Sequence, residues 1–169
     1  MNTRDVQVIG AREVEAALRG LPQKVQRRAM RRALNMAGTP IVRRARSLAP
    51  VDDGDLRRSL GKKVTVDRNP AAHSVLKIGP RTKYPGKTPG KSPANYAHLV
   101  EFGTAAHKIP ARPILKIGPL VVRGVVSHPG SAAQPFLRPA FESTKAEALA
   151  RFRTKLVESI ERLASRGGR

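Results

Sequence analysis

The acids and histidines are the residues of this sequence best suited to chemistry, and their spacing is poor for a catalytic or metal site. Asp52, Asp53 and Asp55 cluster around one turn and could in principle bind a metal ion. The cluster directly follows a helix-forming segment and surrounds Gly54, and aspartate in such a place usually forms a turn or caps a helix. We therefore interpret it as a structural turn.

His98 and Glu101 would lie one helical turn apart if their segment is helical, which leaves a His/Glu metal site conceivable. The remaining candidate ligands, His107 and His128, follow at no tight ligand spacing. Glu101 is also the only acid between residues 67 and 142, in a stretch otherwise dotted with Lys and Arg. We expect it to form a local ion pair or to accept backbone donors, which is a structural role.

Nucleophile and phosphate-binding motifs are missing from the sequence. No serine stands in a Gly-x-Ser-x-Gly elbow. Gly86-Lys87-Thr88 resembles the end of a phosphate loop, but Arg81 stands where that loop requires glycine. We therefore expect no enzyme and assign no catalytic, cofactor-binding or metal residue. A metal-dependent nuclease built on His98, Glu101 and the 52–55 turn is the weakest alternative.

Positive charge dominates the composition. The 169 residues include 33 Lys+Arg against 12 Asp+Glu, which gives a formal net charge of +21. Such a chain repels itself, so an anionic partner is expected, with nucleic acid first and an acidic protein surface second. At 40% hydrophobic the chain can form a core, and the zero cysteine count excludes disulfides and thiolate zinc sites. No apolar run approaches a membrane span, and residues 1–10 carry charges where a signal peptide would need an apolar stretch, so we expect neither.

The segment from Gln23 to Leu48 predicts a long amphipathic helix. Its apolar positions share one broad face, whereas Val42 and Arg44 fall on the wrong faces. Gly38-Thr39-Pro40 should kink or break this helix, because proline lacks an amide donor and crowds the preceding turn. The basic residues assigned to the opposite face are Lys24, Arg27, Arg28, Arg31, Arg32, Arg43 and Arg46.

This basic face has two interpretations that the sequence leaves open. It could contact phosphates as a sequence-independent anchor through counterion release. It could equally be a solvated face, or one matched to acids on a neighbouring subunit. No zinc finger, aromatic stacking platform or helix-turn-helix is recognisable, so any DNA contact should be non-specific.

The other predicted elements indicate an α+β fold, with a long amphipathic N-terminal helix and a C-terminal helix packed on a small antiparallel sheet. A strand at 6–9 and a helix at 11–19 come first. Hairpins are predicted at 63–66 with 74–78 and at 114–117 with 120–126, and residues 95–102 are ambiguous between helix and strand. The last helix begins near Arg138 or Pro139 and has Phe141 on its apolar face. We expect one domain over 1–164, with a Pro/Gly/Lys-rich loop at 81–93, and a flexible tail at 165–169.

Three ordered stretches, Ala45–Leu60, Tyr96–Thr104 and His128–Ala140, together resemble one family. This family contains the neck or tail-completion proteins of long-tailed bacteriophages and is usually labelled gene-product-10-like. The sequence departs from it at Pro40, which interrupts a helix that the family usually runs through. We interpret the residues that carry the resemblance as ones that shape the fold and carry no chemistry, and we expect Phe102 and Phe136 to be buried. These residues are Pro50, Gly54, Leu56, Glu101, Phe102, Gly103, Thr104, Pro135, Phe136 and Pro139.

The resemblance implies a virion protein at the head–tail joint, assembled in the host bacterial cytoplasm. It implies a homo-oligomeric ring, expected to be hexameric, around the DNA channel. Implied partners are other neck proteins such as the stopper or adaptor, the tail terminator or tail tube, and packaged DNA as a non-specific neighbour, with no membrane and no cofactor. The alternative from another class is a free, non-specific nucleic-acid-binding protein.

Overall fold

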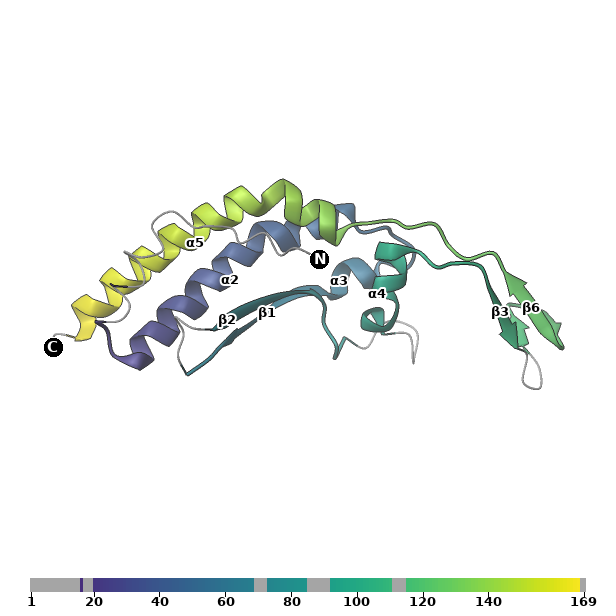
Figure 1. Ribbon diagram of the computed structural model, residues 1–169, viewed down its shortest axis with the longest axis horizontal. Helices are drawn as coiled ribbons and strands as arrows, with labels where there is room; N and C mark the ends of the chain where they lie inside the picture. The colour runs from purple at the N-terminus through teal and green to yellow at the C-terminus, as the bar shows by residue number, and fades with distance from the viewer. Residues whose placement is uncertain (1–15, 17–19, 69–72, 85–91, 111–114, 168–169) are drawn as a thin grey trace.

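The computed structural model describes residues 16, 20–68, 73–84, 92–110 and 115–167. It confirms the α+β class, with a long N-terminal helix, a C-terminal helix and small antiparallel sheets (Figure 1). The predicted strand at 6–9 lies outside these residues, as does the helix at 11–19 apart from Ala16, which is helical. None of the helices within the described residues is long and apolar enough to cross a membrane.

Helix α2 (Gln23–Leu48) runs without a break through Pro40, so the predicted interruption is wrong. Proline removes one backbone donor in the helix. The neighbouring carbonyl of Asn35 accepts from both the Thr39 hydroxyl and the Lys62 ammonium, and Pro40 itself is buried. Tertiary packing around this turn therefore holds a helix that local sequence alone would interrupt.

The hairpin of β1 (Leu60–Val66) and β2 (Ser74–Pro80) packs on α2, and α5 (Leu137–Gly167) packs on α2 from another side (Figure 1). The strands pair in antiparallel register from Leu60 opposite Pro80 to Val66 opposite Ser74. This confirms the first predicted hairpin and lengthens both of its strands. A core cluster joins the three layers through Ala29, Met30, Ala33, Val66 and Leu156.

Two short helices follow the predicted turns. Helix α3 (Asp55–Ser59) begins after Gly54, and α4 (Pro93–Phe102) resolves the ambiguous segment as a helix with proline in its first turn. Proline is well tolerated there because the first amides of a helix have no intrahelical partner. Between the two helices, residues 85–91 of the predicted 81–93 loop lie outside the described part of the chain.

A two-stranded arm extends away from the helices (Figure 1). It consists of β3 (His107–Pro110) paired with β6 (Val125–His128), and of β4 (Leu115–Ile117) paired with β5 (Leu120–Val122). The second predicted hairpin is thus present, but its single strand at 120–126 is two strands. Gly124, with φ of 89°, turns the chain between them, and β3 was not predicted.

Helix α5 begins one residue before the expected start and extends to Gly167, so residues 165–167 form its last turn rather than a frayed tail. Glu147 and Arg151, four residues apart on the exposed surface of α5, form an ion pair of 2.9 Å. The prediction for Phe141 is wrong: its side chain is 50% exposed. In the first turn of α5 it is Ala140, not Phe141, that packs in the core with Ala45 of α2 and with Ala49, which closely follows α2.

Candidate functional site

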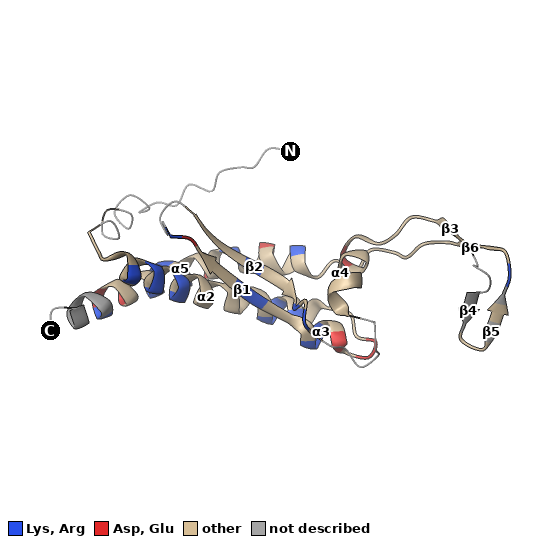
Figure 2. Cartoon of the chain, turned by 90° about the horizontal axis from the view of Figure 1, so that it is seen from below, with Lys and Arg blue, Asp and Glu red and all other residues tan. Residues whose placement is uncertain are grey.

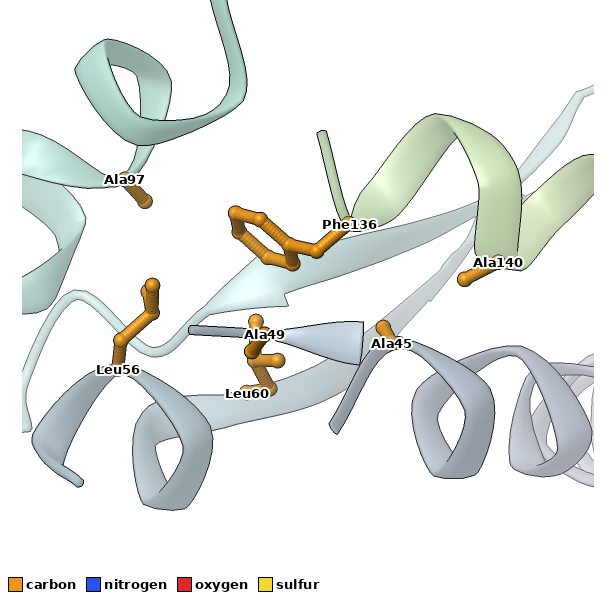
Figure 3. Packing of buried hydrophobic residues seen from close by; sticks show 7 residues of the cluster. All are labelled: Ala45, Ala49, Leu56, Leu60, Ala97, Phe136 and Ala140. Carbon is orange, nitrogen blue, oxygen red and sulfur yellow. The ribbon is translucent and has the colours of Figure 1, made fainter. Parts of the chain in front are cut away.

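The three stretches that carry the family resemblance meet in one core cluster at the junction of α2, α3, α4 and α5 (Figure 3). Phe136 is fully buried at its centre, and Leu56 and Leu60 pack beside it. Small residues allow the helices to approach closely around the phenyl ring of Phe136. The remaining members of the cluster are Ala45, Ala49, Ala97 and Ala140.

Glu101 fastens the end of α4 to the start of α5. Its carboxylate accepts the backbone N–H groups of Phe136 and Leu137 at 2.8 Å each and of Arg138 at 2.9 Å. These amides belong to the residue just before α5 and to the first two residues of the helix, where no intrahelical acceptor exists and the helix dipole favours a negative charge. The expectation that this lone acid accepts backbone donors is confirmed.

The electrostatics of Glu101 agree with this role. Burial by itself opposes ionisation, but the three backbone donors and the nearby Arg138 outweigh it, so the pKa of Glu101 lies below its ordinary value of 4.5. The side chain is 6% exposed and permanently charged at neutral pH. A catalytic acid would need a raised pKa, so the geometry and the charge state both favour a structural role for this carboxylate.

Beyond Glu101, two glycines bring the outgoing and returning chains of the arm together. Thr104 and Ser131 exchange two backbone hydrogen bonds of 2.9 and 3.1 Å. Gly103 has φ of 71°, and a Cβ there would lie 2.6 Å from the Ser131 oxygen; at Gly130, with φ of 87°, it would lie 2.2 Å from the Thr104 oxygen. Both positions therefore require glycine. Gly103 and Gly130 both lie in the stretches that carry the resemblance, but the close approach that requires glycine at each involves the other segment and has no local sequence signal.

The predicted burial of Phe102 is wrong, since its side chain is 76% exposed. The adjacent Glu101 takes the inward position on α4, and consecutive helical residues cannot face the same side. Phe136, Pro135 and Pro139 behave as expected: the segment before α5 enters the core at Phe136, and Pro139 occupies the first turn of the helix. Sequence could not reveal which of the two phenylalanines was inside.

The acidic turn is structural, as interpreted. An Asp53 oxygen accepts the backbone N–H of Asp55 at 2.8 Å, and the buried Asp55 carboxylate lies 2.6 Å from Arg58. Gly54, with φ of 80°, precedes α3 in the left-handed conformation. Within the described residues no group of three or more acids and histidines could hold a metal ion. His98 and Glu101 are therefore not joined by a third potential ligand there.

All seven residues of the predicted basic face are exposed. Arg46 also has a structural contact, because its guanidinium donates to the Leu60 carbonyl at 2.7 Å. The β1–β2 hairpin packs along α2, because the Leu60 carbonyl accepts from Arg46 near the end of the helix and Lys62 reaches Asn35 and Thr39 nearer its start (Figure 2). Gly38 contacts the side chains of Lys62 and Leu76, and Val42 is buried, which explains its apparent misplacement.

Lys62 holds the hairpin in this position. Its ammonium donates to the Thr39 hydroxyl at 2.6 Å and to the Asn35 carbonyl. Burial lowers the pKa of Lys62, as expected for a cation that has exchanged water for backbone and hydroxyl oxygens. Five of the seven cations, from Lys24 to Arg32, lie nearer the start of α2 than the Lys62 contacts, and Arg43 with Arg46 lie nearer its end.

The geometry offers surfaces and a rigid joint rather than a reaction centre, and comparison with known families gives the same class of protein. A family model described as "Bacteriophage HK97-gp10, putative tail-component" matches residues 12–103, which is more than half of the chain. The chain belongs to the HK97-gp10-like family. Its role is accordingly that of a structural tail component of a bacteriophage virion, in contact with other phage structural proteins. Curated proteins and solved structures give no match.

The HK97-gp10-like match ends at Gly103, at the root of the arm. It contains the basic helix, the acidic turn and α4, and therefore two of the three resembling stretches. The third, His128–Ala140, lies outside the matched range. Its connection to the other two is physical, through Phe136 in the shared core and the amides bound by Glu101.

Proposed function

We propose that this HK97-gp10-like protein is a neck or tail-completion protein that joins the phage head to the tail. In this proposal copies of the chain form a ring around the DNA channel, hexameric by family resemblance. The ring contacts a stopper or adaptor on one side and a tail terminator or tail tube on the other. Packaged DNA passes through as a non-specific neighbour.

The observation that carries the proposal is an exposed basic helix face on a rigid scaffold of the HK97-gp10-like family. Helix α2 is fixed on one side by α5 and on another by the hairpin, so its exposed cations have defined positions. Cations without base-reading side chains suit contact with DNA of any sequence. The joint around Glu101 and Phe136 contributes rigidity and no chemistry.

Electron microscopy of phage particles produced without this protein tests the proposal. Heads filled with DNA and separate completed tails are expected, because the ring that connects them is missing. A matched particle preparation complemented with the wild-type gene should restore joined virions. Normal joined and infectious particles in the absence of the protein would contradict a role in joining.

A free nucleic-acid-binding protein is the second candidate, because the net charge of +21 would serve it equally well. Binding of the purified chain to duplex DNA across salt concentrations separates the two. The second candidate requires tight binding by the monomer and an affinity that falls steeply with salt. A neck protein binds weakly until the ring assembles and brings many basic faces together.

Substitution of Arg28, Arg31 and Arg32 by glutamine should weaken binding to the assembled protein uniformly across DNA sequences and reduce its salt dependence. In the control variant, glutamine replaces three exposed cations of the hairpin, Lys63, Arg68 and Lys77. It removes the same number of charges from a surface outside the α2 face. Equal loss in both variants would mean that overall charge, and not the α2 face, attracts the DNA.

A further inference from the structure

Within the part of the chain that the structure describes, the arm projects from the body rather than packing on it (Figure 1). Its strands pack chiefly against each other, and a two-stranded hairpin is only marginally stable alone in water. Val125 is 64% exposed and Val121 54% exposed, both on strands that extend away from the helices (Figure 1). Exposed valines on such a projection indicate a contact surface.

An open groove of about 760 Å³ lies on the body of the same chain. It runs between the end of β2, helix α4 and the first turn of α5, with Pro80, Ala97 and Leu137 in its lining. Phe102 also lines it and is 76% exposed, and Phe141 follows Leu137 by one turn on the same side of α5. The groove is therefore largely apolar, with His98, Glu101 and Arg138 as its polar lining residues and Phe102 as an exposed aromatic ring within it.

The charge distribution selects a second copy of this chain as the occupant of the groove. Residues 124–137, which include the returning strand of the arm, contain no charged residue, and residues 93–106 contain only Glu101. A chain with a net charge of +21 can approach its own copies most easily through such uncharged surfaces. DNA, by contrast, would select the cationic faces and gain nothing from this groove.

The arm cannot fill the groove of its own chain, because it leaves the body at α4 and extends outward (Figures 1 and 2). A projection and a groove at different places on one molecule make a heterologous, head-to-tail contact. Repetition of that contact closes a ring if the rotation between copies permits.

We propose that the β3–β6 arm of one subunit docks, through Val125, in the groove beside Phe102 of the next subunit. This inference rests on the ring of the proposed function and identifies the surfaces that close it. It also explains why Phe102 and Phe141 remain exposed in the single chain: both would be covered in the assembly.

Cross-linking tests the contact directly, because the natural chain has no cysteine. V125C and F102C are prepared as separate single variants, mixed, allowed to assemble and oxidised. A disulfide-linked dimer that contains one chain of each variant is expected. Mixing V125C with V157C is the matched control, since Val157 is 44% exposed on α5 and outside the groove, and should give little product.

The oligomeric state, measured by sedimentation or native mass spectrometry, completes the test. V125K and F102S should each shift the assembled protein toward monomers, and V157K should leave it unchanged. Rings that persist without the V125C–F102C product would overturn the docking of the arm while leaving the proposed function intact. A chain that remains monomeric under all conditions would overturn the ring and, with it, the docking.

Discussion

At the scale of single residues, the structure is held at one joint, and the residues there have constraints that can be tested one at a time. Glu101 binds three backbone amides at the start of α5. Gly103 and Gly130 allow the outgoing and returning segments of the arm to approach within hydrogen-bonding distance. These residues fix where α4, α5 and the arm meet. None of them is suited by its environment to a reaction.

Replacement of Glu101 by glutamine should lower the free energy of unfolding by about 2 to 4 kcal/mol, because amides that now bind a buried carboxylate would lose charged acceptors. Chemical denaturation at neutral pH measures this change. The matched control is E147Q, which removes an exposed carboxylate paired with Arg151 and should cost about 0 to 1 kcal/mol. Equal effects of the two substitutions would contradict the role given to Glu101.

The same residue predicts a pH dependence. The folded-state pKa of Glu101 is lower than its ordinary value of 4.5, so the carboxylate adds stability that is fully present above pH 4.5. That contribution is lost as pH falls through the folded-state pKa. The stability difference between wild type and E101Q should therefore shrink in acid, and a difference that stays constant down to low pH would refute this account.

Gly103→Ala should destabilise the protein by about 2 kcal/mol or more, because the new Cβ meets the Ser131 oxygen and the backbone has a positive φ. Gly79→Ala is the control, since nothing lies within 4 Å of its added Cβ and its backbone is not left-handed. Thermal unfolding of the two variants gives the comparison. If G103A were as stable as G79A, the segments around Gly103 and Ser131 would have to separate without cost, which would contradict the requirement for glycine at this position.

At the scale of elements, the sequence predicted those whose signals are local. The 3.6-residue pattern located α2 and α5, and turn residues located the acidic turn before α3 and the first hairpin. Prediction from the sequence failed where a segment distant along the chain decides the local structure or the burial of a residue. Pro40 stays helical within packed surroundings, Val42 is buried under a hairpin from elsewhere in the chain, and β3 exists only because β6 pairs with it.

The position of the hairpin over α2 depends on Lys62, so Lys62→Met should destabilise the protein by about 1 to 2 kcal/mol. Methionine keeps the aliphatic contact with Gly38 but removes the donor to Thr39 and Asn35. Lys63→Met is the control for the lost positive charge, because Lys63 is exposed on the same strand. Equal stabilities of the two variants would mean that the Lys62 ammonium contributes nothing to the packing of the hairpin on α2.

At the scale of the whole molecule, composition predicted a basic structural protein, and the fold shows how its surfaces differ. Cations are exposed along α2, whereas α4 and the returning strand of the arm are nearly uncharged. The groove and its exposed aromatics could not be predicted, because Phe102 and Phe141 were assigned to the core by local pattern alone. A surface made by three separate segments has no local sequence signal.

The central claim is that copies of this chain form a ring at the head–tail joint of a phage. A cryo-electron microscopy reconstruction of the joined particle tests it most directly. The account predicts a rotationally symmetric ring between the head and the tail, into which α2, α5 and the hairpin fit, with the basic helix face exposed to the channel. Density for this protein located elsewhere in the particle, or a joint without it, would contradict the account.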